Sequence, residues 1–341
     1  MGRVLCTDEA LTAPPGTCAN KPVSVAVLIV VSLLFICART ADSNNATKDR
    51  VLVLGGGGPV GEAWESGVIA GLTEKGIDLS RADLIIGTSA GAIVGARLAS
   101  QMPPADFINA ALNPADGPPP GQSNHASSSP PPDLSFLAAK LEEMGAGKRS
   151  QQSIRAEIGE WAQKVRPVMS ESQFVTSYQR RFPKKEWPGH RYECLTVDAA
   201  DGSVRVWTES SGVPLALAVA SSCALPGVFA PVVINGHRYM DGGVRSVTNA
   251  DLARGCKRAL VLAPTMGLDD PLAKSFTRPL NAELQTLRES GCKVELIVPD
   301  AASLKAFGAS IGDENHRAPA LNAGRIEGRY KAERIAKLWS D

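Results

Sequence analysis

The sequence lacks an excess of charge of either sign. It contains 36 Lys and Arg against 35 Asp and Glu, which leaves a formal net charge of +1 at pH 7. It also lacks a basic block and any interleaving of basic with aromatic residues. Since a nucleic-acid partner requires a basic surface that neutralises its phosphates, the composition favours no such partner.

Paired cysteines of the metal-binding kind are absent as well. The seven cysteines are scattered and odd in number, without a C-x-x-C pair, so they predict neither a zinc site nor a full disulfide framework. We expect most of them to be reduced or buried thiols. The sequence has no calcium-ligand pattern and no internal repeat, and we expect no metal and no cofactor. The cysteines are Cys6, Cys18, Cys37, Cys194, Cys223, Cys256 and Cys292.

An uncharged, mostly apolar run at residues 22–38 differs in composition from the rest of the chain. Irregular sequence precedes it and a polar spacer follows it, so we assign residues 1–49 to an N-terminal segment. The run has 17 residues. A membrane span needs about 20, and a signal-peptide core is usually shorter. We expect this segment to associate the chain with a membrane. Export after signal cleavage and a misassigned start are the alternatives.

Alternating strand and helix patterns fill residues 50–341, and a hydrophobic content of 44% is ample for a buried core. Such alternation predicts an α/β fold with a largely parallel sheet and helices on both faces. The expected strands are residues 51–54, 83–86, 192–197, 204–207, 232–234, 238–240, 259–263 and 294–298. The first expected helix follows the first strand and ends near residue 75. Further helices are expected at 90–99, 214–222 and 281–290, after residues 249–251, and from about residue 318 onward.

Two consecutive segments interrupt this alternation. Residues 103–133 carry two proline triplets and a serine triplet, so we expect a loop or linker without regular structure. Residues 134–181 have a helical pattern with an apolar stripe on one face. The stripe predicts packing on the core; the alternative is a mobile cover over an apolar substrate pocket, as in interfacial enzymes. The stripe consists of Ile154, Ile158, Trp161 and Val165.

A serine between two glycines lies where the expected strand 83–86 meets the expected helix 90–99. The pattern is G-x-S-x-G, with Ser89 between Gly87 and Gly91. The glycines allow a sharp turn, and the turn projects the serine hydroxyl away from the sheet. We predict that Ser89 is a nucleophile. The alternative is an ordinary turn in which Ser89 caps the helix.

Four consecutive glycines, residues 55–58, follow the first expected strand and open a helix. Backbone N–H groups at a helix N-terminus bind an anion, here either an oxyanion or a dinucleotide pyrophosphate. The G-x-G-x-x-G match is weak evidence for a dinucleotide, because the second strand ends in residues 87–89 and not in an acidic residue. Consecutive strand-helix turns share one edge of a parallel sheet, so we expect the amides of Gly57 and Gly58 to face the carbonyl that Ser89 attacks.

A serine nucleophile also needs a base. Among the histidines, His316 follows Ser89 and Asp241 in the chain order of an α/β-hydrolase triad, although no motif surrounds it. The other three lie in loop or turn sequence and are expected to face solvent. These are His125, His190 and His237.

Four motifs, in this order and spacing, resemble those of the patatin-like phospholipases. They are GGGPVG at 56–61, GTSAG at 87–91, ASSCALPGVFAP at 220–231 and DGG at 241–243. The resemblance covers about residues 50–340 and implies a three-layer α/β/α sandwich for the catalytic domain 50–341. The chain differs from plant patatins in its N-terminal apolar run and its proline-rich insert, which leaves the substrate open.

The resemblance also implies a Ser–Asp dyad without histidine. Ser89 is then the nucleophile and Asp241 the general base, while the glycine loop forms the oxyanion hole. A carboxylate whose reference pKa is about 4 must lie close to the hydroxyl and be partly desolvated to act as a base at pH 7. The implied oxyanion-hole residues are Gly56, Gly57 and Gly58, and the remaining motif glycines are Gly61, Gly87, Gly91, Gly242 and Gly243.

The implied activity is hydrolysis of carboxylic esters, commonly of lipids, through an acyl-enzyme. Three alternatives stay open: an esterase with a Ser89/Asp241/His316 triad, a nucleotide-binding protein that uses the glycine loop, and a lipid-binding protein without turnover. The expected partners are a lipid or other acyl-ester substrate and a membrane surface. The sequence indicates neither the physiological lipid, nor the oligomeric state, nor the role of residues 103–181.

Overall fold

One eight-stranded sheet forms the centre of this computed structural model, which describes residues 48–113, 132–184, 186–189 and 191–339. The strands are β1 (Arg50–Leu54), β2 (Leu84–Gly87), β3 (Tyr192–Asp198), β4 (Val204–Trp207), β5 (Val232–Ile234), β6 (His237–Asp241), β7 (Arg258–Leu262) and β8 (Lys293–Ile297). The order is β5-β6-β3-β2-β1-β7-β8, and β4 pairs with β3. The five neighbouring strands β3, β2, β1, β7 and β8 are parallel to one another. Strands β4 and β6 are antiparallel to β3, and β5 is antiparallel to β6.

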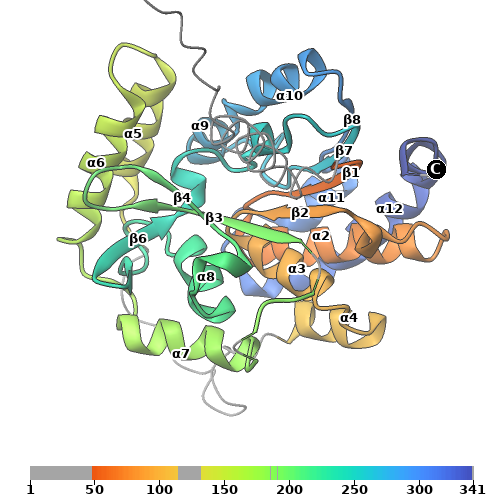
Figure 1. Cartoon of the computed structure of the whole chain (residues 1–341), viewed down its shortest axis with the longest axis horizontal. Coiled ribbons are helices and arrows are strands. Elements are labelled where there is room, and N and C mark those ends of the chain that lie inside the picture. The colour runs from red at the N-terminus through yellow and green to blue at the C-terminus, as the bar shows by residue number, and fades with distance from the viewer. Residues whose placement is uncertain (1–47, 114–131, 185, 190, 340–341) are drawn as a thin grey trace, which may run out of the picture. The chain divides into compact units, whose positions relative to one another are not determined.

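Helices cover both faces of the sheet. Figure 1 shows α10 on one side of β1 and β2, and α2 and α3 on the other. The long C-terminal helix α12 packs along α2. The helices are α2 (Gly58–Thr73), α3 (Ala90–Ala99), α4 (Pro104–Leu112), α5 (Ser135–Gly145), α6 (Gln151–Ala162), α7 (Glu171–Arg181), α8 (Leu215–Ser222), α9 (Pro271–Thr277), α10 (Leu280–Glu289), α11 (Ala301–Phe307) and α12 (Arg317–Trp339).

Strand β1 explains why this sheet needs a helical layer on each face. Its side chains alternate between the two faces, and all four residues of 51–54 are fully buried. Leu52 and Leu54 belong to the core beneath α2 and α3, whereas Val51 and Val53 belong to the core beneath α10. A strand that is apolar on both faces is typical of a parallel sheet between two layers. The predicted α/β fold, a three-layer sandwich with a largely parallel sheet, is confirmed.

Two elements differ from the sequence-based expectation. Helix α4 forms inside the segment 103–133, which was expected to be irregular; proline is favoured in the first helical turn, and Asp106 lies in that turn. Residues 114–131 of that segment lie outside the described residues. After residues 249–251 only a 3-10 turn forms, at Ala250–Ala253, because Asn249 adopts a left-handed conformation and does not cap a helix.

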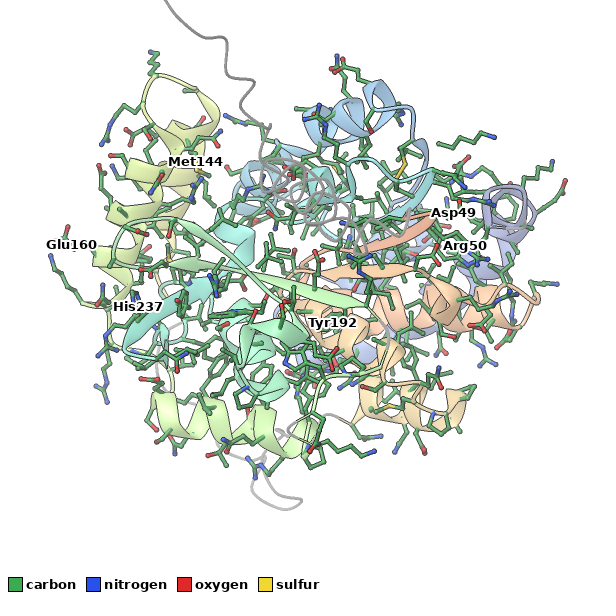
Figure 2. The ribbon with its side chains drawn as sticks, in the orientation of Figure 1. Asp49, Arg50, Met144, Glu160, Tyr192 and His237 are labelled. Atoms are coloured by element: carbon green, nitrogen blue, oxygen red, sulfur yellow. A yellow bond between two sulfur atoms is a disulfide. The ribbon has the colours of Figure 1, made fainter. Side chains whose placement is uncertain are left out.

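The segment 134–181 contains α5, α6 and α7. On α6, Ile154 and Ile158 are fully buried against a core that includes Val197 of β3, as expected for a core-facing stripe. In Figure 2 the labelled Glu160 projects away from the opposite side of this helix. Helix α6 is therefore a packed element and not a loose cover.

One pair of cysteines forms a disulfide, a pairing that the sequence did not indicate. Cys256 and Cys292 are joined with a Cα–Cα distance of 5.5 Å. They precede the paired strands β7 and β8, whose parallel register brings them together. Cys194 and Cys223 are buried free thiols, and the remaining three cysteines lie outside the described residues.

The predicted localisation requires correction. No helix within the described ranges is both long enough and apolar enough to cross a membrane. Residues 22–38, on which the predicted membrane association and its alternative of export depended, lie outside the described residues. We therefore withdraw both the membrane assignment and its alternative.

Candidate active site

Ser89 occupies a sharp turn between β2 and α3. Its backbone has φ of 52°, a left-handed conformation that non-glycine residues adopt rarely and at an energetic cost. It occupies the N-cap position of α3, yet its side chain makes no capping hydrogen bond. The hydroxyl instead lies within hydrogen-bonding reach of the Asp241 carboxyl. The turn therefore holds the hydroxyl for a partner other than its own helix.

Close packing explains the glycines that flank this serine. A Cβ atom on Gly91 would lie 2.1 Å from the carbonyl oxygen of Leu54, and one on Gly87 would lie 2.6 Å from the Cα atom of Ala92. The amide of Gly91 donates to the carbonyl of Gly55 at 3.0 Å. The turn after β2 thus packs directly on the turn after β1, which fixes Ser89 beside the glycine loop.

Asp241 ends β6 and is followed directly by the motif glycines Gly242 and Gly243. Its carboxyl accepts a hydrogen bond of 2.7 Å from the amide of Gly243, while Gly242 packs against the backbone of Leu195 in β3. Only 3% of Asp241 is exposed to solvent. This burial raises the pKa of Asp241 to about 7, although the hydrogen bonds from Gly243 and Ser89 act in the opposite direction. A carboxyl with such a pKa can exchange a proton near neutral pH.

The glycine loop connects β1 to α2. The amide of Gly56 donates to the carbonyl of Val247 at 2.8 Å, so it is engaged within the protein. Gly57 is the N-cap of α2 and Gly58 is its first residue, so both amides lie at the helix N-terminus, where N–H groups have no intrahelical partner. The amide of Gly61 is used within the first turn of α2, donating to Gly57 at 2.9 Å. Of the three residues predicted to form the oxyanion hole, Gly57 and Gly58 therefore fit best.

A single cavity of about 560 Å³ contains these elements together. Gly56, Gly57, Gly58, Ser89 and Asp241 all line it. The rest of its wall is mainly apolar, and helix α7 contributes a large part of it. The larger apolar lining residues are Ile93, Val168, Met169, Phe174, Leu225, Phe229, Val247, Phe276 and Ile311, and Pro59 and Ala90 line it as well.

Three polar residues around the turn were not assigned a role from the sequence. The amide of Ser89 donates to the Ser222 hydroxyl at 3.1 Å, and the Cys223 thiol donates to the Ser89 carbonyl at 3.1 Å. The Asn249 side-chain amide donates to Thr88 Oγ1 at 3.1 Å. The motif at 220–231 pointed to the first two. Nothing in the local sequence pointed to Asn249, which precedes an expected helix.

The two histidines that the structure describes, His237 and His316, lie away from Ser89 and do not line its cavity. His316 Nδ1 is 2.8 Å from the carbonyl of Ala306, its Nε2 is 3.7 Å from Asp313, and it does not line the cavity. His237 is largely exposed and lies 3.0 Å from Asp198. It is the first residue of β6 and pairs with Ile234 at the end of β5, at one side of the molecule in Figure 2. His125 and His190 lie outside the described residues. Within the described ranges, no three His, Cys, Asp or Glu residues form a group that could hold a metal.

The fold and the cavity define the class of protein: an α/β domain with a serine at a strand-to-helix turn, beside a glycine loop. A family model, patatin-like phospholipase, matches residues 52–254. That is more than half of the chain, and the chain belongs to the patatin-like phospholipase family, as the sequence motifs predicted. Membership in this family makes it a lipid hydrolase by class.

Two solved structures are similar over 84% of this chain. VipD from Legionella pneumophila is 13% identical, has 67% of its length covered and superposes with a TM-score of 0.42. The type III effector protein ExoU is 15% identical, with a TM-score of 0.37, and the chain spans about half of its length, 53%. A comparison with curated proteins gave no match. At these TM-scores the two structures carry no further argument.

Proposed function

We propose that this chain is a serine acyl hydrolase that cleaves carboxylic esters of lipids with a Ser89–Asp241 dyad. The observation that carries the proposal is that Ser89 and the buried Asp241 line the same mainly apolar cavity, with the Ser89 hydroxyl within hydrogen-bonding reach of the Asp241 carboxyl. An activated serine requires a base within hydrogen-bonding reach. Asp241 meets this requirement, and its raised pKa suits proton transfer near neutral pH.

In the proposed reaction, Asp241 accepts the hydroxyl proton while Ser89 Oγ attacks the ester carbonyl. The resulting oxyanion lies at the amides of Gly57 and Gly58, where each donor typically contributes about 3 to 4 kcal/mol in the transition state. The tetrahedral intermediate collapses, the alcohol leaves with the proton from Asp241, and an acyl-enzyme remains. Water then attacks this acyl-enzyme while Asp241 again accepts a proton, and as the bond to Ser89 breaks Asp241 returns this proton to Ser89 Oγ, which releases the carboxylic acid and restores the hydroxyl.

The wall of the cavity supports an acyl chain as the group that is transferred. Phe174 of α7 stacks on Phe229 with ring centroids 4.3 Å apart, and both line the cavity. Burial of each methylene of an acyl chain contributes about 0.8 kcal/mol. We further propose that residues 50–341 form the catalytic domain, in which helix α7 of the 134–181 segment forms part of the substrate wall.

The test is hydrolysis of a p-nitrophenyl ester by single variants. Ser89→Ala and Asp241→Asn should each lower kcat by about a thousandfold or more, because the dyad acts as a unit. His316→Ala is the matched control and should keep wild-type kcat. Loss of activity in the His316 variant would support a triad instead, and wild-type activity in Ser89→Ala would remove the nucleophile assignment.

Two further alternatives have their own readouts. A nucleotide-binding protein predicts tight binding of NAD or FAD in a calorimetric titration, whereas the dyad proposal predicts none. A lipid-binding protein without turnover predicts that vesicles bind equally to the wild type and both dyad variants and that no ester is cleaved.

A further inference from the structure

One buried side-chain amide connects the turn that carries Ser89 with the loop that follows Asp241. Asn249 is fully buried, and its Nδ2 atom lies 3.1 Å from Thr88 Oγ1 and 3.4 Å from the carbonyl oxygen of Gly242. Thr88 directly precedes Ser89 in the chain, and Gly242 directly follows Asp241. Two segments that are far apart in sequence, one with the nucleophile and one with the base, are therefore joined by a single side chain.

The backbone of Asn249 directs this side chain toward the two segments. Its φ of 50° is left-handed, a conformation that asparagine adopts more often than most other non-glycine residues. The backbone amide of Asn249 donates to Ser246 Oγ at 3.2 Å, and Nδ2 donates to the carbonyl of Ser246 at 2.5 Å. These contacts close a tight turn, from which the side chain extends to Thr88 and Gly242.

Arg245 determines the orientation of the Asn249 amide. The Nη1 atom of Arg245 donates to Asn249 Oδ1 at 2.6 Å. A guanidinium group carries only donors, so it binds the amide oxygen and leaves the amide nitrogen on the side of Thr88 and Gly242. In the reversed orientation the amide oxygen would face the carbonyl oxygen of Gly242, and the amide N–H groups would face the guanidinium donors. Both of these contacts are repulsive, so Arg245 selects the orientation that joins the two segments.

Asp251 in turn holds the guanidinium group of Arg245. The two carboxylate oxygens of Asp251 lie 2.9 Å from Nη1 and 2.5 Å from Nη2 of Arg245. The side chains of the pair are 24% and 27% exposed, so water reaches them only in part. Paired hydrogen bonds of this kind fix the plane of a guanidinium group, which the point charge of a lysine could not provide. Asp251, Arg245 and Asn249 thus form a chain of hydrogen bonds that ends between the segments of Ser89 and Asp241.

We propose that Arg245, held in a fixed plane by Asp251, is a positioning residue that acts through Asn249 to keep the Ser89 hydroxyl at the Asp241 carboxyl. Arg245, Asn249 and Asp251 do not line the cavity, so they act without contacting the substrate. Their replacement therefore affects the catalytic step and not the binding of the ester. The kinetic tests rest on the proposed function, whereas the hydrogen-exchange test below requires no turnover.

The first kinetic test compares Arg245→Met with Arg258→Met in the hydrolysis of a p-nitrophenyl ester. Arg258 is a matched control: it is 20% exposed and pairs with Asp49 at 3.1 Å, but it begins β7, at the opposite edge of the parallel strands from Ser89. Arg245→Met should lower kcat about 10- to 100-fold and change KM less than about twofold, because displaced catalytic groups lower the rate of the chemical step. Arg258→Met should keep wild-type kcat. Wild-type kcat in Arg245→Met, or an equal loss in both variants, would overturn the proposal.

A double-mutant cycle tests whether Arg245 acts through Asn249. Once Asn249→Ala has removed the amide that Arg245 orients, adding Arg245→Met should change kcat less than about twofold. Losses that multiply in the double variant would show that Arg245 acts by another route and would contradict the proposal.

A lysine variant keeps these tests decisive if Arg245→Met does not fold. Arg245→Lys retains the positive charge but loses the paired contact with Asp251 that fixes the guanidinium plane, and it should lower kcat about 3- to 10-fold without a change in KM. A folded lysine variant with wild-type kcat would contradict the proposal.

The pH profile provides a readout that a loss of stability alone does not change. Burial raises the pKa of Asp241, and the hydrogen bond from Ser89 lowers it. If the Ser89 hydroxyl moves away, the pKa of Asp241 increases, so the acidic limb of kcat/KM should shift to higher pH by about 0.5 unit or more in Arg245→Met. The limb should not shift in Arg258→Met. An unshifted limb in Arg245→Met would mean that Ser89 and Asp241 keep their geometry, and it would overturn the proposal.

Amide hydrogen exchange tests the connection between the two segments without any turnover. In Arg245→Met, the peptides that contain Thr88 and Gly242 should exchange about tenfold faster than in the wild type, whereas Arg258→Met should leave both unchanged. Unchanged exchange in Arg245→Met would overturn the proposal whether or not esters are cleaved. Faster exchange in both variants would show a loss of overall stability only and would also overturn it. Faster exchange of these peptides in Arg245→Met alone would uphold the positioning role even if the wild type cleaves no ester.

Discussion

Replacement of Asp241 by asparagine should remove activity and at the same time stabilise the fold, because Asp241 is held in a site that disfavours its charge. The carboxyl is buried, and its pKa rises from an ordinary 3.8 to about 7. A carboxyl whose pKa is raised on folding binds a proton more tightly in the folded state, so the wild type loses stability as pH increases from about 4 to 7. Asparagine keeps the oxygen that accepts the Gly243 amide but carries no charge.

The expected magnitude follows from the pKa difference of about 3 units. Each unit corresponds to about 1.4 kcal/mol. Relative to low pH, the free energy of unfolding of the wild type is therefore lower by about 4 kcal/mol at pH 9, where the carboxyl is ionised in both states. It is lower by only about 2 kcal/mol at pH 5, where the carboxyl is protonated in the folded state and mostly ionised in the unfolded state. Urea denaturation of the wild type and Asp241→Asn at both pH values measures this cost. The stability difference between the variant and the wild type should increase by about 2 to 3 kcal/mol from pH 5 to pH 9.

A stability difference that is the same at both pH values would refute the reasoning, since it would place the pKa of Asp241 near its ordinary value. The same titration should govern activity. Because Asp241 must be ionised to accept a proton, kcat/KM of the wild type should decrease about tenfold per pH unit below pH 7 and level off above it.

Three further outcomes are expected. Glu65 is buried, which raises its pKa well above the ordinary value, and it accepts a hydrogen bond of 2.9 Å from the amide of Gly55 in the glycine loop. In urea denaturation, Glu65→Gln should therefore gain stability relative to the wild type as pH increases above about 4.5. Asn249→Ala leaves the buried Thr88 hydroxyl without its donor and should cost about 1 to 3 kcal/mol, with a reduced kcat at saturating ester and unchanged ester affinity. Gly91→Ala introduces a Cβ atom 2.1 Å from Leu54 O and should lower the midpoint of urea unfolding by an amount equivalent to about 3 kcal/mol.

The parts of the fold that could be predicted are those with a local cause. Residues 51–54 are apolar on both strand faces, and the sheet indeed buries them on both. The glycines around Ser89 indicated a tight turn, and the backbone there is left-handed and closely packed. Consecutive strand-helix turns of a parallel sheet share one edge, which also predicts the glycine loop beside Ser89.

The parts that could not be predicted depend on long-range neighbours. Cys256 and Cys292 are 36 residues apart and meet only because β7 and β8 are adjacent. Glu62 of α2 lies within 3.6 Å of Arg97, Arg181 and Arg317, which belong to three other helices, and no pattern in any one of these helices marks them. Asn249 resembles a helix cap by sequence, but its side chain reaches Thr88, 161 residues earlier in the chain. Sequence periodicity carries no information about such pairings.

The central claim is that Ser89 carries an acyl group during turnover. Wild-type protein mixed with a p-nitrophenyl ester and quenched in acid within the first turnover should gain the mass of one acyl group, and peptide sequencing should place it on Ser89. The mass should be absent in Ser89→Ala. Ester cleavage by the wild type without an adduct, or an adduct on another residue such as Cys223 in the same cavity, would contradict the account.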